Sequence, residues 1–502
     1  MKAEPDFAAF AENYKAGRGQ AVFARRIADL ETPVSAYLKL ADGRDNTFLL
    51  ESVQGGETRG RYSIIGTDPD LIWRCRSGRA EIARDGAQEF APADTADRPL
   101  DSLRMYIAAT RMELPAALPP MAVGLFGYLG YDMVRLIERL GPSPPDPLDL
   151  PDAILLRPTI TAIFDNIRDE IILVTPVWPR GDLDAAAAYD EARSRLWAAA
   201  GRLGGPVPAA PAAPRTGSSQ QQIQSNISRA DYLALVERAR NYILAGDIFQ
   251  VVPSQRFRRS FALPPFSLYR ALRRLNPSPF LYHLAFPGFS IVGSSPEILV
   301  RLRDGIVTIR PIAGTRPRGP TPNEDARLAC ELMADPKERA EHLMLLDLGR
   351  NDVGRVAATG TVDVTDSFFI ERYSHVMHLV SNVEGRLREG LDAVDALAAG
   401  LPAGTLTGAP KIRAMEIIDE FETEKRGAAY AGAIGYFAAN GTMDTCIVLR
   451  TAIVKDGMMY VQAGGGVVAD SVPEAEYQET VNKAKALFTA ADEAAHFAEP
   501  GA

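Results

Sequence analysis

Alternating apolar and polar positions mark the N-terminal part of the chain. Residues 47–53 (TFLLESV), 61–66 (RYSIIG) and 71–86 (LIWRCRSGRAEIARDG) form alternating runs that end in turn-forming residues. This pattern predicts short strands joined by turns. Residues 122–132 (AVGLFGYLGYD) are nearly all apolar and carry three glycines, which predicts a buried strand that another backbone approaches closely. We therefore expect a β-rich N-terminal part.

The pattern changes after the first strands. A hairpin is predicted around residues 166–169, and an alanine-rich helix at residues 182–204. Residues 205–226 (GPVPAAPAAPRTGSSQQQIQSN) then consist largely of Pro, Ala, Ser and Gln, with almost nothing to bury. Such a segment is typical of a disordered linker. It would separate a β-rich part, residues 1–204, from a second part, residues 227–495.

The second part mixes helical and strand patterns. Ser228 has the position of an N-cap, and the helix that it begins is expected to end at Gly246. Residues 375–387 (HVMHLVSNVEGRL) alternate like a strand, and residues 428–468 read as a meander with Asn-Gly and Asp-Gly turns. Long strands without regular βαβ alternation predict an α+β fold. We expect large antiparallel β-sheets forming a two-layer sandwich with helices on the outside.

Two predicted helices carry carboxylates on one face. Glu476, Glu479 and Lys483 stand at i, i+3 and i+7, and Glu338 and Glu341 form a second E-x-x-E pair far upstream. If the helices meet, four like charges converge, and such a cluster persists only with protons or a cation between its members. Ligands that are all oxygen select a hard ion, and we expect Mg²⁺. The alternative is a pair of ordinary solvated helix faces.

Four further residues are candidates for chemistry, each with a simpler explanation. Arg450 is expected in the middle of a strand (IVLRTAIV), where its guanidinium would need an anionic partner such as a carboxylate, unless it faces solvent. His375 and His378 would point to opposite faces of a strand, so at most one faces the site, and a lone strand histidine is often structural. Glu297 by itself reads as a surface glutamate.

Composition narrows the class of protein. The chain of 502 residues is 46% hydrophobic and 24% charged, with a net charge of −9. No window approaches a membrane span, and no basic stripe could follow a phosphate backbone, so we expect neither a membrane nor a nucleic-acid partner. Three widely spaced cysteines fit a reducing compartment. Because we also find no secretory signal, we expect a cytoplasmic protein.

Several long motifs in the second part resemble a known family. RPIAGTRPRG, LMLLDLGRNDVGRV, RYSHVMHLVSNVEG, GTLTGAPKIRAMEIID and AGGGVVADSVPEAEYQET are similar to segments of the chorismate-utilising enzymes, most closely of their anthranilate synthase component I branch. The resemblance implies Mg²⁺-dependent conversion of chorismate and ammonia to anthranilate and pyruvate, the first step of tryptophan biosynthesis. Residues 227–495 would then be the chorismate-binding catalytic domain.

The resemblance also assigns roles to residues of this chain. Glu341 and Glu479 would hold Mg²⁺, with Glu338 and Glu476 as supporting ligands. Glu297 would act as general acid toward the C4 hydroxyl, and His378 would help to remove the C2 proton. The remaining implied site residues are Thr405 and Lys483 as further catalytic residues, and Gly314, Thr315, Tyr430, Arg450, Gly464, Gly465 and Gly466 as substrate-binding residues.

Two positions bear on which family member this is. Relatives that add water use a lysine base where this chain has Gln250, which argues against an isochorismate synthase. Relatives that make the 4-amino isomer carry a nucleophilic lysine where this chain has Ala313, which favours anthranilate synthase over aminodeoxychorismate synthase component I. A non-catalytic ligand-binding regulator on the same scaffold is a further alternative.

Two partners are implied beyond chorismate and ammonia. None of the three cysteines lies in a nucleophile-elbow pattern, so ammonia from glutamine would come from a separate glutamine amidotransferase subunit. L-tryptophan would act as a feedback inhibitor in the regulatory N-terminal part. The implied tryptophan pocket comprises Leu50, Glu51, Ser52, Pro279, Phe280 and Leu281.

Overall fold

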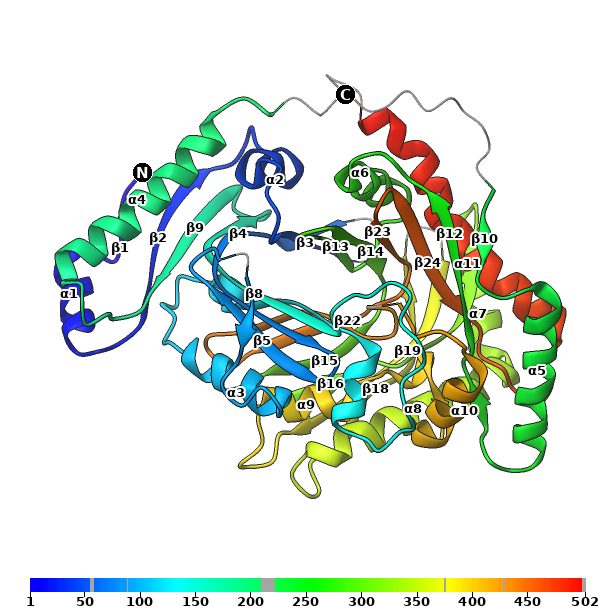
Figure 1. Cartoon of the computed structure of the whole chain (residues 1–502). Coiled ribbons are helices and arrows are strands. Elements are labelled where there is room, and N and C mark those ends of the chain that lie inside the picture. The colour runs from blue at the N-terminus through cyan, green and yellow to red at the C-terminus, as the bar shows by residue number, and fades with distance from the viewer. Residues whose placement is uncertain (55–57, 88, 209–221, 374–375, 428, 499–502) are drawn as a thin grey trace.

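Strands fill the middle of the molecule and helices lie around them (Figure 1). The computed structural model describes residues 1–54, 58–87, 89–208, 222–373, 376–427 and 429–498. Every pairing between the described strands is antiparallel, and hydrogen bonds join 22 of them into one continuous network. The α+β class with a large antiparallel sheet and outer helices is therefore confirmed. Within the described residues, no helix is both long enough and apolar enough to cross a bilayer.

The elements of the described residues have the following bounds. The helices are α1 (Phe7–Lys15), α2 (Pro33–Ala41), α3 (Pro99–Ala109), α4 (Ala185–Gly204), α5 (Arg229–Leu244), α6 (Pro265–Leu275), α7 (Pro322–Ala334), α8 (Pro336–Val356), α9 (Ala393–Gly400), α10 (Lys411–Phe421) and α11 (Pro473–Glu493). The strands are β1 (Ala3–Glu4), β2 (Gln20–Ile27), β3 (Thr47–Gln54), β4 (Thr58–Arg76), β5 (Arg79–Arg84), β6 (Ala91–Pro92), β7 (Gly124–Leu129), β8 (Ala153–Asp165), β9 (Glu170–Val177), β10 (Gln224–Ser225), β11 (Gln250–Val251), β12 (Ser254–Ser260), β13 (Phe280–Phe286), β14 (Phe289–Ser295), β15 (Ile298–Arg303), β16 (Ile306–Ile309), β17 (Ile312–Pro317), β18 (Asp363–Arg372), β19 (Val376–Arg386), β20 (Gly408–Ala409), β21 (Ala433–Ala438), β22 (Met443–Ile447), β23 (Thr451–Lys455) and β24 (Met458–Gly464).

Local signals explain two of these elements, α5 and β7. The Ser228 hydroxyl accepts a hydrogen bond from the Asp231 amide and so caps α5, as the sequence predicts. The predicted buried strand is β7, and a β-carbon at Gly127 would come within 2.0 Å of the Ile154 carbonyl oxygen of β8, which is why glycine stands there.

Some of the N-terminal structure differs from the prediction. α1 and α2 interrupt the β-rich region, and β4 is one strand of 19 residues where the pattern predicts two. Of the predicted linker, residues 209–221 lie outside the described residues. Its end forms β10, which pairs with β12.

Three large hydrophobic clusters make up most of the buried apolar interior of the described residues. One lies between strands of the N- and C-terminal parts and includes Phe48, Phe126 and Ile291. A second packs α2, α4, α6 and α11 against the strands, through Leu40, Leu196, Leu272 and Leu487. The third packs α3, α8 and α9, through Leu103, Leu346 and Leu397. Strands with apolar side chains on both faces therefore have helices covering their outer sides.

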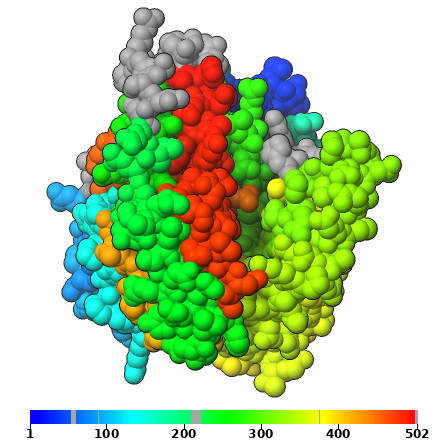
Figure 2. Space-filling model, turned by 90° about the vertical axis from the view of Figure 1, so that its right-hand side faces the viewer, coloured from blue at the N-terminus to red at the C-terminus, as the bar shows by residue number. Residues whose placement is uncertain are grey.

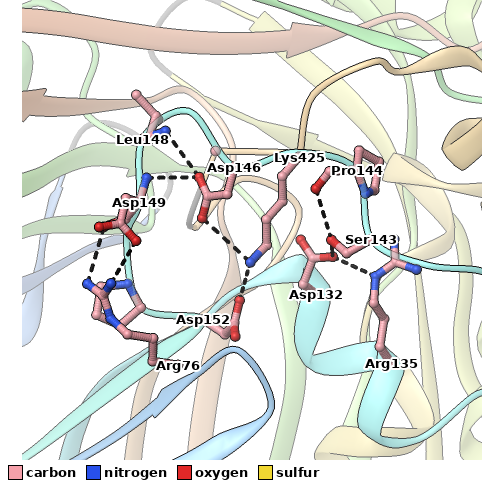
Figure 3. A network of polar contacts seen from close by, with 12 residues as sticks. Arg76, Asp132, Arg135, Ser143, Pro144, Asp146, Leu148, Asp149, Asp152 and Lys425 are labelled. Atoms are coloured by element: carbon pink, nitrogen blue, oxygen red, sulfur yellow. Dashed lines mark hydrogen bonds and ion pairs between the residues drawn. The ribbon is translucent and has the colours of Figure 1, made fainter.

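The two parts of the chain share one sheet network. β3 pairs with β13 so that Leu50, Glu51 and Ser52 oppose Tyr282, Leu281 and Phe280, and β7 pairs with β21. Ion pairs add to this junction: Lys425 of the C-terminal part binds Asp152 and lies 3.7 Å from Asp146, both in the N-terminal part (Figure 3). The N-terminal part is thus a structural neighbour of the strands that carry the candidate site.

Candidate active site

The two acidic helices, α8 and α11, approach each other across a hollow. Figure 2 shows this hollow between α11 and the yellow-green surface formed by α7 and α8. Burial raises the pKa of Glu341, and neighbouring carboxylates raise it further. These are Glu338 on the same helix and Glu479 and Glu476 on the facing helix. Glu341 therefore lies within electrostatic range of the other three predicted carboxylates.

Two of these carboxylates are paired with cations of the chain itself. The Arg316 guanidinium lies 2.8 Å from Glu338, and the Lys483 ammonium lies 2.7 Å from Glu479. Accordingly, no group of three or more acidic, histidine or cysteine side chains is already gathered tightly enough to hold a metal ion within the described part of the chain. Lys483 also donates to the Gly464 carbonyl at 2.9 Å, so this lysine joins the acidic helix to the glycine run.

The glycine run lies directly against the acidic helix and two polar side chains. A β-carbon at Gly465 would come within 3.0 Å of Glu476 Oε2, and one at Gly464 within 3.0 Å of the Tyr430 hydroxyl. A β-carbon at Gly466 would come within 2.3 Å of Gln250 Nε2. Any side chain in this run would displace a polar group of the site, so only glycine allows this close approach.

His378 is a neutral imidazole whose free nitrogen faces the interior. Its Nδ1 lies 3.1 Å from the Gly314 carbonyl oxygen and 3.0 Å from the Thr315 hydroxyl. Because a carbonyl only accepts, Nδ1 carries the hydrogen, and Nε2, buried and without a hydrogen-bond partner among the described residues, keeps its lone pair. Burial lowers the pKa of His378 to about 4. A β-carbon at Gly314 would lie 2.9 Å from Glu338 Oε2, which connects His378 to α8.

Glu297 is a buried carboxyl that holds its proton near neutral pH. Only 7% of its surface is exposed, and burial raises its pKa to about 8, although the Thr405 hydroxyl, 3.5 Å away, and the Arg450 charge act in the opposite direction. A carboxyl of this kind can donate a proton, which a solvated glutamate at the same pH cannot. The view of Glu297 as a surface glutamate is therefore wrong.

Arg450 does not lie in the middle of a strand, so that prediction was wrong. It falls between β22 and β23, with a left-handed φ of 49° that breaks the run of alternating residues. Burial lowers its pKa, and Tyr373 and Glu297 beside it oppose this change. Its backbone carbonyl accepts from the Ser294 amide at 3.2 Å. The guanidinium therefore points into the same buried region as Glu297.

Several residues of this region were missed by the sequence reasoning. The Tyr373 ring packs edge-on against His378, with centroids 5.4 Å apart, and Arg316 holds both Glu338 and Asp335. Tyr373 belongs to the same motif as His378, and Arg316 to the same motif as Gly314. Their closeness in sequence to these predicted residues was the available signal. The second histidine considered, His375, lies outside the described residues.

A separate cavity contains most of the implied tryptophan residues. Its volume is about 300 Å³, within the range of small-molecule pockets. Leu50, Glu51, Ser52, Phe280 and Leu281 line it, while Pro279 is not among its lining residues. The Glu51 carboxylate is buried and binds Arg273 at 2.6 Å. Two larger cavities, of about 1190 and 830 Å³, lie beside α2 and contact none of the predicted site residues.

Comparison with known proteins identifies the family of this chain. The family described as chorismate binding enzyme matches residues 47–489. Anthranilate synthase component 1 from Cereibacter sphaeroides is 58% identical, over 98% of this chain and 98% of that protein, and its counterpart from Pseudomonas putida is 51% identical, over 92% and 93%. The crystal structure of anthranilate synthase component I from Streptococcus pneumoniae superposes with a TM-score of 0.73 at 40% identity, covering 85% of this chain and 92% of that one. The chain therefore belongs to the chorismate binding enzyme family and, within it, to the anthranilate synthase component 1 group.

Proposed function

We propose that this protein converts chorismate and ammonia to anthranilate and pyruvate with the help of Mg²⁺. The observation that carries the proposal is a protonated Glu297 and a neutral His378 that both lie within reach of the Arg450 charge. The reaction exchanges a hydroxyl for an amine and then removes a proton, so it needs one acid and one base. The environments of these two residues move their pKa values apart, as such a pair requires.

The acidic residues of α8 and α11 suit a hard divalent cation. Glu341 and Glu479 would be the ligands, with Glu338 and Glu476 supporting them. The donor set is all carboxylate oxygen, as Mg²⁺ prefers. Burial and then the neighbouring carboxylates raise the pKa of Glu341, and a cation would offset the repulsion between these carboxylates. When bound, the ion supplies positive charge that holds the ring carboxylate of chorismate in place. Arg316 and Lys483 would release their carboxylates as it binds.

The residues of the chain supply the proton transfers. Glu297 gives its proton to the C4 hydroxyl, which leaves as water while the nitrogen of ammonia bonds to C2 and the ring double bonds shift. The ammonium group formed at C2 then loses one proton to become the amine, and the Glu297 carboxylate takes up a proton again. His378 Nε2 then takes the C2 proton as the C3–oxygen bond breaks; the enolpyruvyl group leaves, gains a proton and becomes pyruvate, and the ring becomes aromatic. Arg450 and Tyr430, with Gly314, Thr315 and Gly464 to Gly466, would hold the substrate, and Thr405 would orient Glu297.

The positions that separate the related enzymes also favour this reaction. Gln250 contacts Gly466, so the place of the lysine base that water addition needs is held by a neutral amide. Ala313 precedes Gly314 in β17 and offers no nucleophile toward C2. Aminodeoxychorismate synthase activity predicts the 4-amino product instead, and a non-catalytic regulator predicts ligand binding without turnover.

Glutamine-derived ammonia would come from a partner glutamine amidotransferase subunit. Burial raises the pKa of the Cys75 thiol to about 12 and that of Cys446 still further, so neither is an activated nucleophile. L-tryptophan would occupy the 300 Å³ cavity lined by Leu50 and Phe280 and act as an inhibitor.

The test uses purified chain, chorismate, ammonium chloride and MgCl₂, with anthranilate followed by its fluorescence. Formation of anthranilate that stops on chelation of Mg²⁺ supports the proposal. Chorismate binding that survives Glu341→Gln and His378→Ala, with no turnover at any ammonium concentration, would identify a regulator. Determining the position of the amino group on the product separates anthranilate from its 4-amino isomer.

A further inference from the structure

A buried arginine lies behind the residues proposed to hold chorismate. Arg426 follows α10 in the chain segment that leads to Tyr430, and only 3% of its surface is exposed. Its guanidinium carbon lies 5.7 Å from the centroid of the Tyr430 ring. Burial raises the pKa of Tyr430 to about 12, and the Arg426 charge opposes this rise. The two side chains therefore share one buried environment.

The charge of Arg426 is balanced within the protein. Its Nε lies 2.9 Å from Glu422 Oε2, and its Nη2 lies 2.7 Å from Glu422 Oε1. Only 9% of the Glu422 surface is exposed. Two parallel bonds of this kind pair the guanidinium with one carboxylate. Arg426 is therefore already neutralised and does not need a substrate anion as its partner.

The other bonds of Arg426 go to two backbone segments that border the site. Its Nη1 donates to the Leu406 carbonyl at 2.7 Å, and its Nη2 also donates to the Val252 carbonyl at 2.7 Å. The Val252 amide in turn donates to the Thr407 carbonyl at 2.9 Å. A guanidinium can reach both segments and the carboxylate at once, because its five N–H groups spread over a rigid plane.

The first segment carries Thr405. The Thr405 hydroxyl lies 3.5 Å from Glu297, the proposed general acid. The next residue, Leu406, provides the carbonyl that Arg426 binds. The guanidinium therefore fixes the peptide beside the hydroxyl that orients Glu297.

The second segment supports the glycine run. Ser254 pairs with Gly464 where β12 meets β24, and a β-carbon at Gly464 would come within 2.8 Å of the Pro253 carbonyl oxygen. Glu422 also holds this segment, because its Oε1 accepts from both the amide and the hydroxyl of Ser254 at 2.8 Å. The glycines proposed to hold chorismate therefore rest on backbone that the Arg426–Glu422 pair fixes.

We propose that Arg426 is a positioning residue: paired with Glu422, its guanidinium holds the Thr405 segment and the glycine run in the relative places that binding of chorismate requires. The inference rests on the proposed function and adds to it a residue that does not touch the substrate. Because one side chain bonds to both segments, its loss would allow each segment to move against the other.

The experiment exchanges the guanidinium for an ammonium and measures both substrates. With the full chain, Mg²⁺ and ammonium chloride, Arg426→Lys should raise the KM for chorismate at least about five-fold and leave the KM for ammonium within about two-fold. The dissociation constant of chorismate, measured by calorimetry with Mg²⁺ and without ammonium, should rise by a similar factor. A smaller folded fraction lowers the maximal rate and leaves each KM unchanged, so these constants report positioning and not stability.

Lys425→Met is the matched control. Lys425 precedes Arg426 in the chain, but its ammonium binds Asp152 in the N-terminal part (Figure 3). Both side chains of this pair are largely buried, with 13% and 8% of their surfaces exposed. Removing the cation leaves a buried carboxylate unpaired, so the unfolding temperature should fall. Both KM values should nevertheless stay within about two-fold of those of the wild type.

The outcomes separate this inference from the proposed function. If the wild-type chain binds no chorismate, both fail. If it binds chorismate but forms no anthranilate, the proposed function fails, and the dissociation constants of wild type and variant alone decide on positioning.

Three results with an active wild type would refute positioning alone. In the first, folded Arg426→Lys keeps the KM and the dissociation constant of chorismate within about two-fold of the wild type. In the second, Arg426→Lys raises the KM for ammonium as much as that for chorismate. In the third, Lys425→Met raises the chorismate constants equally. Should Arg426→Lys fail to fold, as judged by thermal unfolding, the double variant Arg426→Met with Glu422→Gln removes both charges together and replaces it under the same criteria.

Discussion

The buried carboxyl of Glu297 links catalysis to stability, and Glu297→Gln tests both at once. In the folded protein its pKa is about 8, against 4.5 for an ordinary glutamate. Between these values the unfolded chain has lost a proton that the folded chain keeps, so the free energy of unfolding falls as the pH rises, and the loss is complete above the folded pKa. Glutamine has nearly the same shape and no proton to lose. The variant should therefore escape this loss.

The magnitude follows from the size of the pKa rise. At about 1.36 kcal/mol for each pKa unit, the full loss has a ceiling of roughly 5 kcal/mol. Of this loss, roughly 2–3 kcal/mol occurs between pH 6 and pH 9. The rest occurs below pH 6, because the loss begins at the pKa of the unfolded chain. For a chain of this length about 1 kcal/mol shifts the unfolding temperature by ~1 °C. Glu297→Gln should thus gain ~2–3 °C on the wild type over that pH range.

The assay measures unfolding temperature and turnover on the same samples. Wild-type and variant proteins are heated at pH 6 and pH 9, and anthranilate formation is followed at a constant concentration of free ammonia. Turnover of the wild type should decline above about pH 8 as the acid loses its proton. The variant should be slower by roughly 10²–10⁴-fold and show no such decline, because its proton donor is gone.

Either of two results would refute this reasoning. One is a difference in unfolding temperature between variant and wild type that is the same at both pH values, which would mean that Glu297 is ionised in the fold. The other is a wild-type profile whose decline at high pH persists in Glu297→Gln, which would assign that decline to a different group.

Three further changes probe the rest of the site. His378→Ala removes the free Nε2 and should lower kcat by roughly 10²–10⁴-fold with little change in the KM for chorismate, measured by steady-state fluorescence; a larger effect on KM than on kcat would make His378 a binding residue. Gly465→Ala brings a β-carbon within 3.0 Å of Glu476 Oε2 and displaces this carboxylate. The Mg²⁺ concentration for half-maximal rate should therefore rise several-fold. An unchanged Mg²⁺ titration would contradict a role for Glu476. Arg273→Met leaves the buried Glu51 carboxylate without its main partner, so the free energy of unfolding measured with denaturant should fall by about 3–5 kcal/mol. Inhibition by tryptophan should weaken as well. Inhibition as strong as that of the wild type would show that Glu51 takes no part in binding tryptophan.

The sequence alone was sufficient for features that depend on neighbours along the chain. The Ser228 cap, the hairpin of β8 and β9 and the acidic faces of α8 and α11 all follow from local spacing, since a helix or a strand places side chains with a known period. The α+β class follows from the same periods. Even the conflict of four like charges can be stated from sequence, provided that the helices meet.

Where local pattern failed, a contact from elsewhere in the fold had overridden it. Arg450 stands among β-branched and apolar residues, but its backbone turns to the left-handed region between β22 and β23. Tyr373 reads as one aromatic residue among many until β18 and β19 pair and bring it against His378. Arg426 reads as an ordinary charged residue until the fold brings two distant backbone segments against its guanidinium.

Which residue types are present, and at what spacing, was determined by the sequence; which of them are buried and which hold a proton was decided by the tertiary structure. Glu297 holds a proton and His378 does not because both are buried by strands and helices distant in sequence, and the free energy of a charge depends on that burial. Periodicity can place a side chain on a face. It cannot say what covers that face, because the covering residues come from other parts of the chain.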